Sequence, residues 1–191
     1  WACYGVEISP SMLRYGSGKG WMVTSDPRGD PRFGDGTFDV VTMIEVLEHV
    51  VDPVGLLTDA ARWLRPGGLL YVTTPNAGGL NCRILRQTWS VVCPPQHLVL
   101  WTPRALRVAL ARAGLRTSRL RAEGFNPAEI LAWLQGGRSA AEGVNRYQSG
   151  LALSAALGRS RVRRMVKAAV NGGLSAFGLG DTLKVWASRA G

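Results

Sequence analysis

The chain has 191 residues, 46% of them hydrophobic, and a formal net charge of +10. This length builds one domain, the apolar content excludes a disordered chain, and no apolar run approaches the roughly 20 residues that a membrane helix needs. Its three cysteines form no CxxC pair, which excludes a zinc ribbon or a disulfide framework and predicts a reduced, cytoplasmic protein.

The first elements of the chain alternate between strand and helix. Residues 2–8 predict a short strand, residues 9–16 a helix with proline at its first position, and residues 21–25 a second strand. The run FDVVTMI, residues 38–44, is apolar and rich in β-branched side chains, so it predicts a strand buried on both faces.

A helix follows, with Asp52 as its cap and Pro53 at its start, and RPGG at residues 65–68 ends it. Residues 69–74 predict another buried strand. The helix places an apolar stripe at helical spacing, formed by Leu56, Leu57, Ala60, Ala61 and Leu64.

The last elements continue the alternation. Thr102 and Pro103 open a helix that Gly114 closes, and a strand follows at residues 115–123. Helices are expected over residues 127–135 and 150–177, before a terminal strand at 181–189. Strands separated by helices indicate an α/β fold with a parallel, doubly wound sheet.

The charges are unevenly distributed. Residues 1–59 carry 4 basic and 9 acidic side chains, residues 60–122 carry ten arginines and no acid, and residues 138–191 carry 9 basic and 2 acidic. Such asymmetry marks either a surface for an anionic partner, such as nucleic acid, a phosphorylated substrate or a lipid, or solvated helix faces.

Four stretches together resemble class I S-adenosylmethionine-dependent methyltransferases, in particular the bacterial group similar to ubiquinone-pathway methyltransferases. They are GVEISPSML (5–13), FDVVTMIEVLEHVVDP (38–53), LRPGGLLYVTTPN (64–76) and PPQHLVLWTPRALRVALARAGL (94–115). The resemblance implies a Rossmann-like sheet, mostly parallel, whose last strand is antiparallel.

The resemblance also implies a cofactor site for S-adenosylmethionine. Glu7, at the end of a strand, would accept hydrogen bonds from the ribose hydroxyls, as acidic residues of dinucleotide sites do. Ile8 and Met12 would pack on the adenine, Asp26 would accept from its amino group, and Ile44 would also contact the cofactor.

One family feature is absent. The family's first strand and its Gly-rich turn should precede Trp1, so we expect an N-terminally truncated chain that binds the cofactor poorly by itself and is inactive alone. YGSGKG (15–20) contains a GxGxG pattern, but it follows a helix instead of a strand and is not expected to replace that turn.

The remaining candidate catalytic or metal-binding residues lie in the segment MIEVLEHV (43–50) and at His97. If residues 45–49 form a helical turn, Glu45, Glu48 and His49 share one face, at the sheet edge where ligands bind in α/β folds. Three hypotheses remain open: these residues hold the loop, His49 or His97 is a general base, or Glu45, Glu48, His49 and His97 bind a divalent metal.

The metal hypothesis has a parallel, since an ExxEH turn with a later histidine resembles the metal sites of small-RNA terminal 2′-O-methyltransferases and of some ubiquinone-pathway O-methyltransferases. Two carboxylates and two imidazoles suit Mn, Fe, Co or Zn better than Mg. A metal would help to activate a hydroxyl acceptor, whereas an amine acceptor needs little more than orientation.

We therefore expect one methyltransferase domain over residues 1–191, with the sheet core at 1–126 and 181–189 and a helical substrate-covering region at 127–180. The predicted activity is O-methylation of a small or lipid-linked acceptor. The alternatives are an RNA 2′-O-methyltransferase and a non-catalytic binding protein with a methyltransferase fold. The basic stretch GRSRVRRMVKAAV (158–170) indicates either a surface for phosphate or anionic lipid or a solvated helix face.

Overall fold

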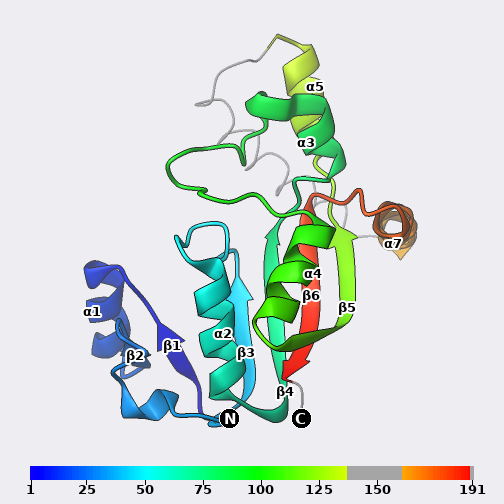
Figure 1. The fold of residues 1–191 in the computed structure, drawn as a ribbon. Helices are drawn as coiled ribbons and strands as arrows, with labels where there is room; N and C mark the ends of the chain where they lie inside the picture. Colours follow the sequence, from blue (N-terminus) through cyan, green and yellow to red (C-terminus); the bar gives the residue numbers. More distant parts are fainter. Residues whose placement is uncertain (137–160, 190–191) are drawn as a thin grey trace.

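A computed structural model of the chain describes residues 1–136 and 161–189 (Figure 1). The strands are β1 (Tyr4–Val6), β2 (Met22–Thr24), β3 (Phe38–Ile44), β4 (Leu64–Pro75), β5 (Leu115–Glu123) and β6 (Thr182–Arg189). The α-helices are α1 (Pro10–Gly18), α2 (Pro53–Trp63), α3 (Leu80–Leu85), α4 (Pro103–Arg112), α5 (Pro127–Leu134) and α7 (Arg161–Ala176), and two 3₁₀ turns are η1 (Pro31–Phe33) and η2 (Arg86–Thr88). No helix in these ranges is both long and apolar enough to cross a membrane.

The strands form two sheets. β1 and β2 pair in parallel, and a four-stranded sheet has the order β3-β4-β6-β5. β3 and β4 are parallel, whereas β6 runs antiparallel to both β4 and β5. The α/β fold with an antiparallel last strand is therefore confirmed.

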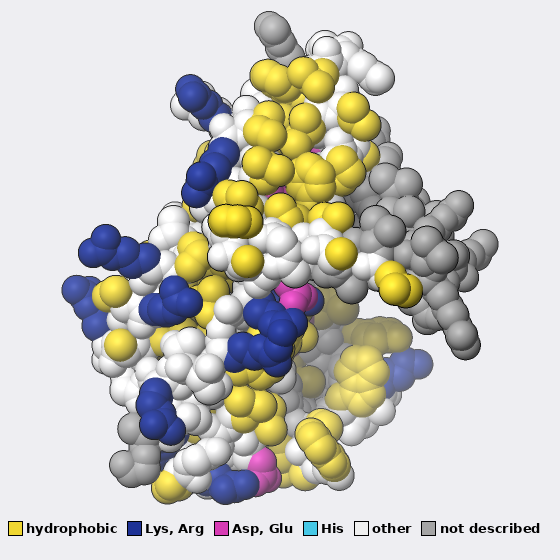
Figure 2. Space-filling view, turned by 90° about the vertical axis from the view of Figure 1, so that its right-hand side faces the viewer, with side chains coloured by type: hydrophobic (Ala, Val, Ile, Leu, Met, Phe, Trp, Pro, Cys, Tyr) yellow, Lys and Arg dark blue, Asp and Glu magenta, His cyan; other side chains and the backbone are white. Residues whose placement is uncertain are grey.

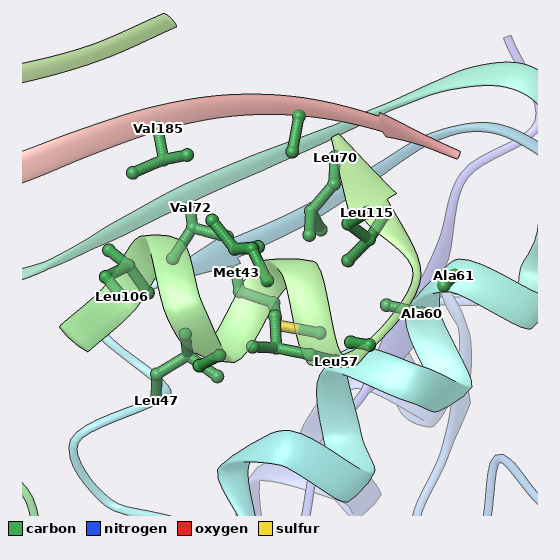
Figure 3. Packing of buried hydrophobic residues seen from close by; sticks show 14 of the residues in the cluster. Met43, Leu47, Leu57, Ala60, Ala61, Leu70, Val72, Leu106, Leu115 and Val185 are labelled. Atoms are coloured by element: carbon green, nitrogen blue, oxygen red, sulfur yellow. The ribbon is translucent and has the colours of Figure 1, made fainter. Parts of the chain in front are cut away.

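The core lies between the four-stranded sheet and the helices α2 and α4, which cover the same face of it (Figures 1 and 3). Leucines from both helices meet inward-facing side chains of the sheet, because alternate strand residues point to one face. Fully buried members include Leu57 on α2, Leu106 and Leu110 on α4, Val72 on β4 and Val185 on β6.

β3 has the predicted bounds, but the prediction that both of its faces are buried is wrong. Met43 is its only buried residue, while Val40 is 36% and Ile44 62% exposed. β3 is an edge strand of its sheet, and β1 and β2 pair with each other instead of extending that edge. An apolar run alone does not distinguish an edge strand from a central one.

The caps and turns behave largely as predicted. Asp52 accepts the N–H of Gly55 and Thr102 accepts the N–H of Ala105, so both helices begin where the sequence indicated. Two bounds are wrong. α1 continues to Gly18, past Gly16, and β4 begins at Leu64 and includes the RPGG stretch, where Gly67 has φ +75°.

The predicted helix at residues 150–177 overlaps α7, which is described from Arg161, and the earlier part of that prediction lies outside the described residues. α7 lies beside β5, and α3 and α5 lie beyond the carboxyl ends of the β3 and β4 strands (Figure 1). These helices therefore stand next to the edge of the sheet where the candidate site was expected.

Candidate functional site

The segment after β3 is a bend followed by a turn, and the predicted helical turn at residues 45–49 is wrong. Glu45 has φ +52°, a left-handed conformation that costs a non-glycine residue about 1–2 kcal/mol. The N–H of Glu45 donates to the backbone oxygen of Thr73, and the N–H of His49 donates to Val46. Residues 45–49 therefore do not share one helical face, although the Glu45 carboxyl group still lies close enough to Glu48 for the two to interact.

Glu48 is a buried carboxylate whose two oxygens have different surroundings. The residue is 0% exposed, and its Oε2 accepts a hydrogen bond of 2.8 Å from the hydroxyl of Thr74, near the end of β4. Its Oε1 is buried without a hydrogen-bond partner. Leaving such an oxygen unpaired costs about 1–3 kcal/mol, more for a charged group, so the site is incomplete as a purely structural arrangement.

The two histidines have the same hydrogen-bond arrangement. His49 Nδ1 lies 2.8 Å from the carbonyl oxygen of Gln96, and His97 Nδ1 lies 2.6 Å from that of Val91. Because a carbonyl oxygen only accepts, each Nδ1 carries the proton, and each neutral ring keeps a lone pair on Nε2. A backbone carbonyl on the far nitrogen is the usual way in which proteins orient a metal-binding histidine.

Backbone hydrogen bonds join the turn that contains Glu48 and His49 to the segment that contains His97. The carbonyl oxygen of Glu48 accepts the N–H of Leu98 at 2.7 Å and that of Val99 at 3.2 Å. The turn that carries His49 is thereby fixed to the segment that follows His97, and the two imidazole rings lie edge to face with their centroids 4.6 Å apart.

Glu48, His49 and His97 form a group that we call the histidine cluster. Each offers one ligand atom, and these atoms lie within 4.8 Å of one another. The Nε2 of His49 is 3.9 Å from the unpaired Oε1 of Glu48, too far for a hydrogen bond. Two imidazole nitrogens and one carboxylate oxygen suit a divalent transition metal, so the residues fit such an ion.

Glu45 does not belong to the histidine cluster among the described residues. Partial loss of hydration raises the pKa of its carboxyl group, and the negative charge of Glu48 raises it further. The structure thus brings together three of the four predicted metal ligands and leaves the fourth beside them.

The predicted cofactor residues lie in two parts of the fold: Glu7, Ile8 and Met12 follow β1 or lie on α1, and Ile44 ends β3 in the other sheet; we call these four residues the β1 edge. Glu7 follows β1 and is half-buried, with its Oε1 accepting the N–H of Ser9 at 2.7 Å. Ile8 is 85% exposed, Met12 54% and Ile44 62%. A carboxylate and exposed apolar side chains are the groups that a ribose and an adenine would need, so the residues fit the adenosine part of S-adenosylmethionine.

Asp26 is the weakest member of the predicted cofactor set. It is exposed in the loop after β2, and its Oδ1 accepts the N–H of Gly29 at 3.1 Å. This bond closes a local turn, so part of its acceptor capacity serves the loop.

Three supporting residues were not identified from the sequence. Thr74 orients Glu48, and Glu129 on α5 accepts the N–H of Ser90 in the loop that carries His97. A signal for Glu129 was present, because it is the single acid of an otherwise apolar helix, PAEILAWL. Asp181 accepts the N–H groups of Asn81 and Asn126, and burial raises its pKa to about 6.

Curated relatives match about half of the chain. The chain is 34% identical over 103 residues to a ubiquinone biosynthesis O-methyltransferase of Parvibaculum lavamentivorans, an alignment that covers 48% of this chain and 38% of the relative. It is 31% identical over 116 residues to the Xanthomonas oryzae protein of the same name, covering 58% and 38%. The chain thus spans well under half the length of these relatives.

Solved structures with the same fold include methyltransferases. A SAM-dependent methyltransferase of Thermotoga maritima has a TM-score of 0.59 at 17% identity, covering 97% of this chain and 72% of that one. Phosphoethanolamine N-methyltransferase 2 of Haemonchus contortus, solved with S-adenosyl-L-methionine, has a TM-score of 0.54 at 16% identity, covering 100% and 44%. At these identities the likeness establishes the fold.

A model of the methyltransferase domain family matches residues 1–120, which is more than half of the chain. This match covers all four stretches quoted for the resemblance. It also includes Glu48, His49 and His97, the residues of the histidine cluster. The chain therefore belongs to the methyltransferase domain family, and it has the fold of solved SAM-dependent methyltransferases.

Proposed function

We propose that the full-length protein transfers a methyl group from S-adenosylmethionine to an oxygen atom of a small or lipid-linked acceptor, beside a divalent metal held by the histidine cluster. The observation that carries the proposal is that Glu48, His49 and His97 each bring one ligand atom to within 4.8 Å of the others, while Oε1 of Glu48 is buried without a hydrogen-bond partner. The names of the relatives, O-methyltransferases of ubiquinone biosynthesis, support an oxygen acceptor.

The residues of the β1 edge would bind the cofactor, and those of the histidine cluster would bind the ion. Glu7 would hold the cofactor ribose at the β1 edge, and the exposed Ile8 and Met12 would cover the adenine. Glu48, His49 and His97 would hold the ion, with Thr74 fixing the carboxylate of Glu48. The ion, when bound, would supply Lewis acidity that makes an acceptor hydroxyl easier to deprotonate.

A metal-free version of the same chemistry is the main alternative. With Nδ1 of each histidine committed to a backbone carbonyl, either Nε2 could accept a proton from an acceptor hydroxyl. A phenol, with a pKa of about 10, is within reach of a histidine base. The unpaired Oε1 of Glu48 favours the metal version, because a general base does not explain that buried oxygen.

The helices of residues 127–180 are proposed to cover the acceptor. α5 lies beyond the carboxyl edge of the sheet and exposes Leu131 (58%) and Leu134 (66%), and Ile84 of α3 is 38% exposed. Hydrophobic side chains gather over this upper part of the molecule (Figure 2). An apolar surface here would suit an acceptor with a hydrophobic portion.

The experiment is a methyl-transfer assay of the full-length protein, stripped of metal with a chelator and supplied with S-adenosylmethionine and a panel of phenol, amine and RNA acceptors. We expect transfer to a phenolic hydroxyl that returns on addition of Mn²⁺, Co²⁺ or Zn²⁺. Equal activity before and after stripping would support the general base and reject the metal. Transfer to no acceptor would support the non-catalytic alternative.

RNA as acceptor is a second candidate because of the arginines of α4. Arg104, Arg107 and Arg112 have no acidic partner among the described residues, unlike Arg28, which pairs with Asp59. RNA binding through them would weaken steeply with salt, since each phosphate contact releases counterions. RNA binding that weakens steeply with salt, together with RNA methylation, would favour this candidate over the small acceptor.

A further inference from the structure

α5 has an inverted pattern of burial. Its one acid, Glu129, is 2% exposed, whereas Leu131 and Leu134 on the same helix are more than half exposed. No lysine, arginine or histidine among the described residues forms an ion pair with Glu129. A buried carboxylate without a cation is costly, so its position needs an explanation beyond packing.

The contact that Glu129 makes is with the loop that carries His97. Its Oε1 accepts the N–H of Ser90 at 2.7 Å. The next residue, Val91, supplies the carbonyl oxygen that holds His97 Nδ1 at 2.6 Å. Two consecutive residues, Ser90 and Val91, thus connect the Glu129 carboxylate to the carbonyl that fixes the tautomer of His97.

The other side-chain contacts of the loop are local or farther along it: Cys93 Sγ lies 3.5 Å from the Val91 carbonyl oxygen, and His49 Nδ1 lies 2.8 Å from that of Gln96. The segment is held at its far end, where the N–H groups of Leu98 and Val99 donate to Glu48, and inside it by local bonds such as Val92 N–H to Trp89 and Cys93 N–H to Val91. Glu129 is therefore the side chain that joins the near end of the loop to a neighbouring helix.

α5 is itself anchored to the start of β6. Asp181 accepts the N–H of Asn126, the residue before α5, through Oδ2, and the N–H of Asn81 through Oδ1. Asn81 also donates its side-chain amide to the carbonyl of Asn126 at 3.1 Å. These bonds make α5 a fixed support from which Glu129 can hold the loop.

We infer that Glu129 is a positioning residue for His97: its carboxylate holds the Ser90 N–H and with it the Ser90–Val91 segment, so that the Val91 carbonyl keeps the proton of His97 on Nδ1 and leaves Nε2 free. The inference deepens the proposed function and rests on it for the role of the free Nε2. The tautomer of His97 can be measured without metal or substrate, which keeps the two claims separable.

The experiment records the tautomers of His97 and His49 by ¹⁵N NMR in the metal-free, full-length protein, at a pH where both rings are neutral, and then titrates Co²⁺ by visible absorbance. Glu129→Leu removes the acceptor at similar volume, and Glu129→Gln keeps an acceptor oxygen. Ser90→Pro removes the same hydrogen bond from the loop side. Trp89, with φ −64° and ψ 128°, already has a backbone that a following proline accepts.

We expect wild type and Glu129→Gln to show both histidines protonated on Nδ1. Glu129→Leu and Ser90→Pro should lose that preference at His97 while His49 keeps it, and should bind Co²⁺ about 10–100-fold more weakly, as losses of supporting partners at metal sites usually do. Combining Glu129→Leu with Ser90→Pro should add little, because both remove one bond.

Two controls separate positioning from general stability. Leu131→Gln changes an exposed residue of the same helix, and Leu110→Ala lowers the melting temperature from a buried site in α4. Neither should alter the His97 tautomer. An unchanged tautomer in Glu129→Leu or Ser90→Pro, or an equal change in Leu110→Ala or Glu129→Gln, would overturn the inference. If the variants change the His97 tautomer as expected but the wild type binds no Co²⁺, the inference about Glu129 stands and the proposed metal site is rejected.

Discussion

The histidine cluster and the β1 edge belong to the same candidate site, yet they are built differently. Glu48 is fully buried and hydrogen-bonded to β4, and its backbone fixes the loop of His97. At the β1 edge, Ile8, Met12 and Ile44 are exposed, and β1 pairs only with β2. The described residues thus preorganise the acceptor side of the site more completely than the cofactor side.

This difference explains what each region can do alone. A cluster held by backbone carbonyls and a buried core can bind an ion without further ordering, since its ligands are already oriented. Residues on two separately paired strands hold a cofactor less well, because binding must also fix the strands relative to each other. We therefore expect residues 1–191 to bind a divalent ion better than they bind S-adenosylmethionine.

The largest expected effect would come from Glu48→Gln in the full-length protein. Loss of the carboxylate ligand should lower methyl transfer to a hydroxyl acceptor by more than about 100-fold, beyond what supporting residues usually cost. The measurement is kcat/KM for the phenol acceptor, with cofactor binding followed separately by calorimetry and expected to change little. Asp39→Asn, on an exposed strand residue, is the matched control. Full activity in Glu48→Gln would remove the cluster from the reaction.

A pair of stability variants compares the packing of the two regions. Leu110→Ala, in the core between α4 and the four-stranded sheet, should lower the free energy of unfolding by about 2–5 kcal/mol. Ile8→Ala, at the β1 edge, should change it by less than about 0.5 kcal/mol. Urea unfolding monitored by tryptophan fluorescence measures both. Similar losses would mean that the β1 edge is as tightly packed as the core.

The pH dependence of stability tests the burial of Asp181, whose carboxylate anchors the start of α5. Burial raises the pKa of Asp181 from 3.8 to about 6, so the folded state binds a proton more tightly than the unfolded chain does. Its contribution is favourable below a pH of about 4 and is lost as the pH rises through about 6, a difference on the order of 2 kcal/mol.

Asp181→Asn should remove this dependence. The difference in unfolding free energy between wild type and variant, measured from about pH 4 to about pH 8, isolates Asp181 from the other carboxylates. A difference that stays constant over this range would contradict the assignment.

The smallest effect on metal binding is expected at Glu45, the predicted ligand that lies outside the cluster. Because its φ is +52°, Glu45→Gly should raise the free energy of unfolding by up to about 1 kcal/mol by relieving backbone strain. Metal affinity should change far less than in Glu48→Gln. A loss of ion binding as large as that of Glu48→Gln would return Glu45 to the set of ligands.

Local patterns predicted the fold well where neighbours in sequence decide it. β3 and β5 have the expected bounds, and the caps Asp52 and Thr102 make the expected bonds. The exposure of Ile44 was not predicted, because it depends on which strands pair at the edge of β3. The hydrophobic pattern of a strand predicts the burial of its side chains only when the strands that pair with it are known.

The candidate site was predicted in its residue types and only partly in its geometry. Glu48, His49 and His97 meet as expected, whereas the left-handed backbone of Glu45 breaks the helical spacing that would have included it. The carbonyl of Val91 and the carboxylate of Glu129 act through a loop fold that no motif encodes. Long-range support of this kind depends on tertiary contacts and becomes visible only in the structure.

The most direct test of the central claim is Co²⁺ titration of the metal-free, full-length protein, followed by visible absorbance and by metal analysis after dialysis. The account predicts one ion per chain in wild type, with absorption bands that indicate nitrogen and oxygen ligands. It also predicts loss of the ion in Glu48→Gln and in a variant with His97→Ala. A wild type that retains no ion, or an ion that stays bound with equal affinity in both variants, would contradict it.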